Sequence, residues 1–415
     1  MKLWQKILLG LFLGVIMGSL VHPLGLSPYS DYLRSIGDVF MNLIRMLVVL
    51  LIFSSMTVGV TSIRDPKKLG RVGIKTLLFY LTTTIMAISI GMVFAYLIRP
   101  GEGIVFSGAK SVNISALPPL KEMVLDIIPS NPIASLAQGN VLQIIVFSLF
   151  LGIAITASGE RGNPLLHLLE SISEVMYRLT EIVMKFAPYG VFAIMTWVVS
   201  SYGIQVLKSL TQFLICNYLA SFFHVVLVYG GMLIFVSRLN PWNFFRGMGD
   251  AIALAFSTNS SSATLPVSLR CVQDNLGVSK NIASFVLPLG ATVNMDGAAI
   301  SQAITAVFVS QVYGIDLDWQ ALLTIIVTAT LGAIGAAGIP GTTLVMLTVV
   351  LTSVGLPLEG IMLVAGVDRV REMVSTVVNI LGDSVVAVGV AKSEGELDKA
   401  QYNQKELVVA EENNL

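Results

Sequence analysis

Long apolar segments separated by short polar links run through the first 240 residues of the chain. A membrane-spanning helix needs about 20 mostly apolar residues. Segments of that length lie near residues 7–25, 36–63, 74–98, 133–157, 165–202 and 208–236. Lys2 and Lys6 before the first segment resemble the start of a signal peptide, but no small-residue cleavage site follows. The pattern therefore predicts membrane helices over all these segments, with the first one retained.

The polar links predict the orientation of these helices. The link 64–75 (RDPKKLGRVGIK) carries five Lys or Arg residues against one Asp, which places it in the cytoplasm by the positive-inside rule. Because two helices precede it, the N-terminus is also predicted to be cytoplasmic. Residues 99–131, rich in Pro, Gly and Ser, read as a loop on the opposite face. Residues 393–415 lose all apolar periodicity and are predicted to form a polar cytoplasmic tail.

Two later segments, 242–275 and 319–353, are apolar but interrupted. The interruptions read STNSSSATLP (257–266) and GAIGAAGIPGTT (332–343). Irregular backbone at membrane depth is tolerated only where protein or a water-filled cavity covers it. Paired interrupted segments indicate the binding site of a transporter with inverted repeats. We therefore expect two re-entrant helical hairpins. The alternative, surface loops between separate helices, is disfavoured because each arm is short for a full crossing.

Composition supports a membrane protein. The chain of 415 residues is 55% hydrophobic and only 12% charged, against about 25% charged residues in soluble domains. The net charge is zero and no basic run is present, so nucleic acid is not expected as a partner.

Carboxylates nevertheless occur within the apolar segments. Asp296 lies in 287–300 (LPLGATVNMDGAAI), and three more acidic residues lie in the last apolar segment. At about 100° per residue, six polar side chains of that segment share one stripe of a helix: Asp368, Glu372, Ser375, Thr376, Asn379 and Asp383. Arg369 and Arg371 fall outside the stripe, on opposite flanks.

These carboxylates require compensation. Each one costs at least about 2.5 kcal/mol within a membrane, so the four together cost on the order of 10 kcal/mol. Clusters of carboxylate, amide and carbonyl oxygens suit hard cations. The alternative is a structural network of arginines and carboxylates. It explains Asp368 with Arg369, but leaves Asp296 and Asp383 without obvious partners.

The motifs SSSATLP, NMDGAA and AAGIPGTT, followed by the polar stripe, resemble in this order those of the glutamate transporter family, the dicarboxylate/amino acid:cation symporters. The resemblance covers residues 6–393. It implies an all-α membrane protein, not an enzyme, with eight transmembrane helices and two re-entrant hairpins. It also implies a homotrimer with lipid around it and an amino acid as substrate. The short loops predict a prokaryotic inner membrane.

The resemblance further implies two domains and an elevator motion. Scaffold helices would occupy 1–73 and 132–206. A mobile transport domain would contain 74–98 and 207–392, with the second hairpin as its gate. The 99–131 loop would lie outside the cytoplasm and 393–415 would form the tail.

The resemblance also assigns sodium as the coupling ion, at two to three sites, without an organic cofactor. The first site would use Gly290, Asn294, Asn379 and Asp383. A deeper site would use Tyr80, Thr83, Thr84, Asn294 and Asp296. A third would use Thr292, Met295 and the carbonyls of 333–336, and would form when the second hairpin closes.

The substrate's amino acid backbone would be held by positions that match the family. Ser261, Ile339 and Gly341 would offer backbone groups to its carboxylate, and Thr376 and Asn379 would add side chains. Glu372 stands where the family has an Asp that receives the substrate ammonium.

Other positions depart from the acidic-substrate pattern of the family. Ser375 replaces an Arg, Ala298 replaces a Thr, and Asn259 stands where some prokaryotic relatives place Arg. A second substrate carboxylate would then be desolvated without a partner. The sequence therefore predicts sodium-coupled symport of a neutral, small or compact amino acid. The alternative is an acidic amino acid or dicarboxylate symporter of the same fold, proton-coupled through Glu372, with Arg371 reaching the pocket. An intramembrane aspartyl protease is disfavoured, because residues 380–383 read ILGD instead of GxGD.

Overall fold

The computed structural model describes residues 3–21, 27–61, 69–102, 128–203, 206–335 and 342–404. These residues are mostly helical, and the one β-bridge within the described ranges joins Val278 to Leu397. The prediction of an all-α protein is confirmed.

The six apolar segments of the first half all form helices. The helices are α1 (Leu3–Val21), α2 (Ser27–Thr61), α3 (Leu69–Ile98), α5 (Pro132–Gln138), α6 (Val141–Ala157), α7 (Asn163–Met184), α8 (Ala187–Tyr202) and α9 (Val206–Phe223), so the segment 133–157 is divided into α5 and α6. The segment 165–202, expected as one helix, is divided into α7 and α8. Pro188 lies in the first turn of α8, where a proline is tolerated but from which a helix does not continue backwards undisturbed.

The helix that begins as α9 continues with an unusual geometry. Two π-helical turns, His224–Tyr229 and Met232–Ser237, extend it on either side of Gly230 and Gly231. In a π turn each N–H bonds to the carbonyl five residues earlier, and such turns often mark functional sites.

The second half contains the two interrupted segments. Its helices are α10 (Pro241–Gly247), α11 (Gly249–Thr258), α12 (Ser261–Arg270), α13 (Lys280–Val293), α14 (Asp296–Tyr313), α15 (Trp319–Gly335), α16 (Thr342–Ser353), α17 (Gly360–Ala365), α18 (Asp368–Glu394) and α19 (Lys399–Tyr402). A π turn, Cys271–Asn275, follows α12.

The first interrupted segment forms a helical hairpin. Asn259 adopts a left-handed conformation (φ 55°) that reverses the chain, and the Ser260 side chain then accepts a hydrogen bond from the Ala263 N–H at the start of α12. The two arms have 10 residues each, which gives about 15 Å per arm. This is half of the roughly 30 Å hydrocarbon core of a bilayer, so the arms pack together without crossing it.

The second interrupted segment has α15 and α16 as its arms, and these also pack against each other. Its tip, residues 336–341, lies outside the described residues. This tip includes Ile339 and Gly341.

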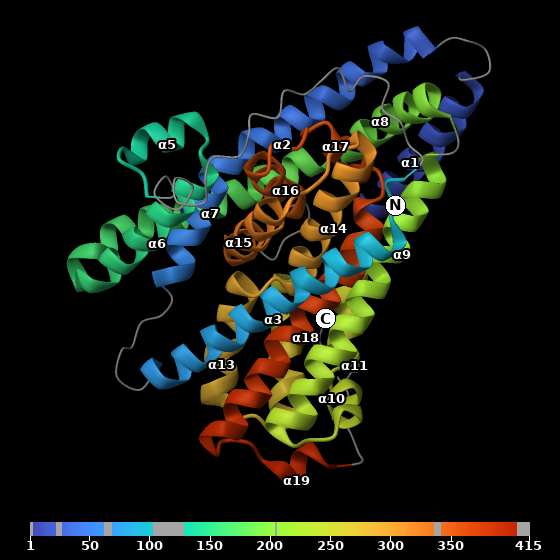
Figure 1. Cartoon of the computed structure of the whole chain (residues 1–415). Helices are drawn as coiled ribbons and strands as arrows, with labels where there is room; N and C mark the ends of the chain where they lie inside the picture. The colour runs from blue at the N-terminus through green and yellow to red at the C-terminus, as the bar shows by residue number, and fades with distance from the viewer. Residues whose placement is uncertain are drawn as a thin grey trace.

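The helices pack in two groups. In one, α2 packs against α6, α7 and α8, and α1 packs against α8; in the other, α14 is surrounded by α3, α15, α16 and α18. Figure 1 shows α2 and α8 lying across the top of the bundle that holds α3, α14 and α18. The division of the chain into scaffold and transport parts remains a prediction.

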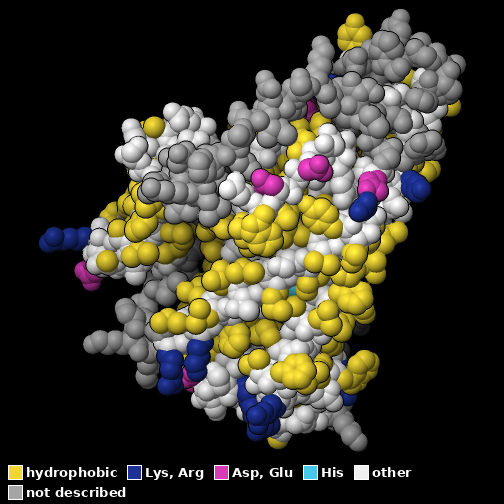
Figure 2. Space-filling view, in the orientation of Figure 1, with side chains coloured by type: hydrophobic (Ala, Val, Ile, Leu, Met, Phe, Trp, Pro, Cys, Tyr) yellow, Lys and Arg dark blue, Asp and Glu magenta, His cyan; other side chains and the backbone are white. Residues whose placement is uncertain are grey.

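The surface is that of a membrane protein. Three helices of the described part are long and apolar enough to span a bilayer: Arg71–Ile98, Val206–Ser237 and Asp368–Glu394. Figure 2 shows hydrophobic side chains covering the middle of one face, with charged side chains gathered above and below them.

The contact between α1 and α8 depends on glycines spaced four residues apart. A Cβ added at Gly14 would lie 2.7 Å from the Phe192 carbonyl oxygen, and one at Gly18 would lie 2.7 Å from the Val199 Cβ. Small residues at this spacing let two helices approach closely in a membrane.

We expect Gly14→Leu to destabilise the protein by about 2 kcal/mol through overpacking, measured as a lower melting temperature in detergent. Leu13→Val, at an exposed position beside it, should have little effect; equal melting of both variants would contradict this contact.

Candidate functional site

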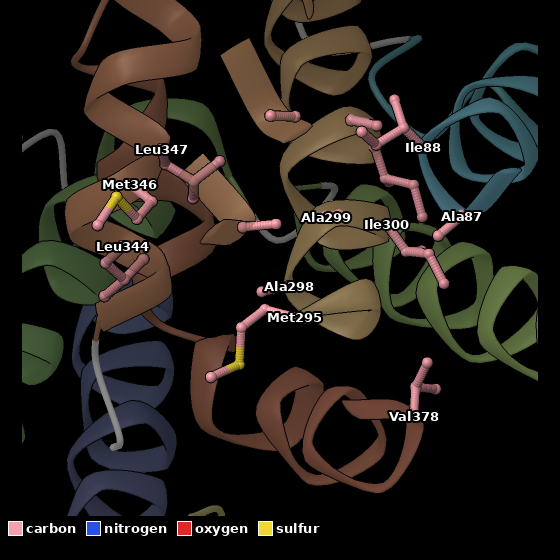
Figure 3. Packing of buried hydrophobic residues seen from close by; sticks show 14 of the residues in the cluster. Ala87, Ile88, Met295, Ala298, Ala299, Ile300, Leu344, Met346, Leu347 and Val378 are labelled. Atoms are coloured by element: carbon pink, nitrogen blue, oxygen red, sulfur yellow. The ribbon is translucent and has the colours of Figure 1, made fainter. Parts of the chain in front are cut away.

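The centre of the molecule contains a broken helix. α13 ends at Val293, Asn294 and Met295 have non-helical backbone angles, and α14 begins at Asp296. The sequence pattern suggested one continuous apolar span here, whereas the structure interrupts it. Asn294 and Asp296 are both fully buried. Figure 3 shows Met295 and Ala298 at the start of α14, between α16 and α18.

Asp296 receives hydrogen bonds on both carboxylate oxygens. Thr84 of α3 donates to Oδ1 at 2.6 Å, and the Tyr229 hydroxyl of the first π turn lies 2.8 Å from Oδ2. The Nε2 atom of His224 lies 3.4 Å from the same Oδ2. All these side chains are buried.

Asp383 of α18 is linked to this group through Asn294. The Asn294 amide nitrogen donates to Asp383 Oδ1 at 3.1 Å, and the Asn294 oxygen lies 3.4 Å from the Thr83 hydroxyl. The Tyr80 hydroxyl, which donates to the Val286 carbonyl at 2.8 Å, closes the group on the α13 side.

Gly290 is required by this close approach. A Cβ at position 290 would overlap Asp383 Oδ1 and would lie 2.5 Å from the Tyr80 hydroxyl. The backbone of α13 therefore lies directly against the carboxylate. This brings together most of the residues assigned to the first two cation sites.

The donor set suits a hard cation. In the described part of the chain, neither Asp296 nor Asp383 forms an ion pair with a Lys or Arg. Two buried carboxylates without a Lys or Arg partner are unfavourable, while hydroxyl, amide and carboxylate oxygens are the ligands that hard cations prefer. The group can therefore hold small cations between α3, α13, α14 and α18.

The third predicted cation set stays a prediction, because part of it lies outside the described residues. The Thr292 hydroxyl donates to the Leu289 carbonyl of its own helix at 2.9 Å. The Met295 sulfur instead meets the Asn379 amide nitrogen at 3.3 Å. Of the 333–336 carbonyls, that of Ala336 lies outside the described residues.

The predicted substrate residues lie near the first hairpin tip and α18. The Asn259 amide nitrogen donates to the Arg369 carbonyl at 3.0 Å, which fixes the tip against the start of α18. Ser261 begins α12 at this tip and is buried. The Asn379 oxygen accepts from the Gly297 N–H at 2.8 Å and so holds the start of α14. The remaining described positions are also buried: Ala298, Glu372, Ser375 and Thr376.

The arginines lie closer to this region than expected from the helix positions. Arg371 is only 1% exposed and donates through Nε (2.8 Å) and Nη2 to Asp368, while its Nη2 lies 3.9 Å from Glu372. Arg369 donates to Glu372 at 3.1 Å. Both arginines were predicted to lie outside the polar stripe, yet both contact acidic residues of the stripe. Long side chains reach residues three positions away on a helix.

These ion pairs leave some arginine atoms unmatched. Nη1 of Arg371 and Nε of Arg369 are buried and have no hydrogen-bond partner among the described residues. The alternative of an arginine–carboxylate network thus holds for Asp368 and Glu372, but not for Asp296 and Asp383.

His224 and Tyr229 were missed from the sequence. In an α-helix residues five apart point about 140° away from each other, whereas the π turn brings them to one face. Their rings lie 4.7 Å apart, edge to face, beside Asp296. Hydrophobic periodicity carries no signal for a π turn, so only the isolated polar residues in an apolar segment hinted at this role.

Comparison with known proteins agrees with this geometry. The model of the sodium:dicarboxylate symporter family matches residues 3–393. The chain is 36% identical to the proton/sodium-glutamate symport protein of Geobacillus stearothermophilus, over 97% of this chain and 95% of that protein. It is 35% identical to the proton/glutamate-aspartate symporter of Escherichia coli, over 95% and 93%. It is 33% identical to the C4-dicarboxylate transport protein of Azorhizobium caulinodans, over 96% and 90%.

A match over this share of the chain, together with two helical hairpins and a broken helix carrying the buried carboxylates, leaves one conclusion: this chain belongs to the sodium:dicarboxylate symporter family.

Proposed function

We propose that this symporter carries a small acidic amino acid or dicarboxylate together with sodium ions. The observation that carries the cation coupling is the pair of buried carboxylates, Asp296 and Asp383, without a Lys or Arg partner in the described residues. Sodium ions would neutralise them, and the substrate would be held between the first hairpin tip, α14 and α18.

Cation coupling follows from the connections of Asn294. Its amide joins Asp383 to the hydroxyl of Thr83, and the adjacent Thr84 holds Asp296. An ion at one carboxylate would therefore orient the ligands of the other. The relatives named as proton/sodium-glutamate symport proteins support coupling to sodium, to protons, or to both.

Arg371 supports an acidic substrate. Asp368 and Glu372 contribute two negative charges, and Arg369 and Arg371 contribute two positive charges, so this cluster is already neutral. The Nη1 atom of Arg371 is buried and has no acceptor among the described residues, which is unfavourable until an acceptor reaches it. A substrate carboxylate would supply a charge-assisted hydrogen bond there. Glutamate, aspartate and C4-dicarboxylates are the substrates in the names of the relatives.

A neutral amino acid is the second candidate. Ser375 and Ala298 are buried on the facing sides of α18 and α14, and neither offers a charge to a second carboxylate. A zwitterion would add no net charge to the neutral cluster. We further propose that transport follows the predicted elevator motion within a homotrimer, with the second hairpin as gate.

The two substrates can be separated with proteoliposomes under a sodium gradient. We expect uptake of aspartate or succinate, and we expect Arg371→Gln to weaken the binding of both about tenfold or more, because a charge-assisted hydrogen bond is lost. Arg270→Gln, which removes an exposed pair with Asp250, is the matched control.

Sodium-driven uptake of alanine or serine that excess aspartate does not inhibit would favour the neutral candidate. In that case Ser375→Arg with Ala298→Thr should introduce aspartate binding. Uptake that follows a pH gradient in sodium-free buffer would assign the coupling to protons.

Asp383→Asn tests the cation site. Removing the charge of the Asp383 carboxylate removes part of the attraction for the ion, so the sodium concentration for half-maximal uptake should rise more than about tenfold. Sodium titrations of uptake measure this. Asp250→Asn, at an exposed position, should leave the titration unchanged; an unaltered titration for Asp383→Asn would remove this residue from the site.

Tyr229→Phe tests the support that the π turn gives to Asp296. Loss of one buried hydrogen bond of about 1 kcal/mol should raise the half-saturating sodium concentration about fivefold, with the substrate affinity at saturating sodium nearly unchanged. Tyr402→Phe loses a hydrogen bond to the Asn240 carbonyl, away from the site, and should change neither value. Equal sodium dependence of both variants would show that Tyr229 only packs.

A further inference from the structure

A groove of about 550 Å³ lies between α3 and the π-helical extension of α9. One wall is formed by residues 75–86 of α3 and the other by residues 227–236. The lining side chains are mostly apolar. Gly231 lies in the second wall, and a Cβ added there would meet only the Phe235 ring, at 3.9 Å, so there is open space at this position. Pockets of 300–1,000 Å³ are typical of small-molecule sites.

The groove opens on the hydrophobic surface and has the length of one bilayer leaflet. Leu78 is 58% exposed and Phe235 is 80% exposed, so its rim faces the lipid side of the protein. From Lys75 to Met86, α3 rises about 16 Å, about half of the roughly 30 Å hydrocarbon core. An acyl chain of one leaflet would therefore fit along it.

One end of the groove is basic. Lys75 lines this end, and Arg71, one turn earlier on α3, is exposed. Both contact Glu394 at the end of α18, with Lys75 at 2.5 Å, so two positive charges share one carboxylate and an excess positive charge remains. Figure 2 shows Lys and Arg side chains below the hydrophobic surface at the end where α3 begins. Basic pockets between membrane helices bind anionic lipid headgroups.

The inner part of the groove reaches the residues that surround Asp296. Thr83 lines the groove and also contacts Asn294, and the next residue, Thr84, donates to Asp296. On the other wall Val228 lines the groove, and the next residue, Tyr229, donates to Asp296. The separation of the two walls therefore also sets the separation of two groups that hold this carboxylate.

We propose that an anionic phospholipid binds in this groove, with one acyl chain between α3 and the π turns and its phosphate at Lys75 and Arg71. Its presence holds the two walls in the arrangement that binds a cation at Asp296. The lipid and the cation thus strengthen each other's binding, as linkage requires. The coupling rests on the proposed function, whereas binding of the lipid does not.

Lipid binding is tested with the delipidated full-length protein, titrated with phosphatidylglycerol and counted by native mass spectrometry. Thr82→Trp fills the groove, and Leu81→Trp places the same side chain at the neighbouring, exposed position outside it. We expect Thr82→Trp to weaken binding at least about tenfold and Leu81→Trp to leave it unchanged. Lys75→Gln should weaken binding about fivefold through loss of one basic charge. Equal binding of phosphatidylcholine, or equal binding by the two tryptophan variants, would overturn the site.

Coupling is tested by sodium titration of uptake in vesicles of phosphatidylcholine with and without phosphatidylglycerol. We expect phosphatidylglycerol to lower the half-saturating sodium concentration at least about fivefold for the wild type and Leu81→Trp, but not for Thr82→Trp. Sodium titrations that are identical in both vesicles would overturn the coupling. Uptake that does not depend on sodium in any of the vesicles would contradict the proposed function instead. The number of bound lipids measured by mass spectrometry would still show whether the lipid site exists.

Discussion

The buried charge of Asp296 and Asp383 is the constraint on which the arrangement of the inner helices depends. Neither carboxylate has a Lys or Arg beside it in the described residues, so hydroxyl and amide donors have to solvate both. Those donors come from α3, the π turn and the α13–α14 break. The break in the helix places Asn294 between the two carboxylates, and Gly290 lets the α13 backbone approach one of them. The π turn and the helix break give up regular α-helical hydrogen bonds. They place the hydroxyl and amide groups that solvate the two carboxylates.

The other two buried acids, Asp368 and Glu372, form ion pairs with arginines. Asp368 and Glu372 lie on the same helix as Asp383, but arginines of that helix neutralise them. The helix thus divides into a neutral half beside the first hairpin tip and a negative half beside α3 and α13.

Much of this arrangement could be predicted from the chain alone. The polar stripe of α18 follows from helical periodicity, and the first hairpin follows from a polar interruption in an apolar segment. The contacts of Thr84 and Asn294 with the carboxylates agree with the positions that the family resemblance implied. Other features could not be predicted. A helical wheel places Cβ atoms and not guanidinium groups, so it separated Arg371 from acids that its side chain reaches. Hydrophobic periodicity does not indicate the π turn, so the contact of Tyr229 with Asp296 could not be predicted from its apolar neighbours.

The position of α3 has a consequence for how the molecule is made. Thr84 and Asp296 are 212 residues apart in the sequence, and Lys75 and Glu394 are 319 apart. During translation α3 therefore enters the membrane long before its partners exist. Three of its hydroxyls, those of Thr76, Thr82 and Ser89, bond to carbonyls of the same helix one turn earlier, which satisfies these donors before the partner helices exist. Such distant pairings delay assembly, so the ion-binding centre can be completed only after nearly the whole chain has left the ribosome.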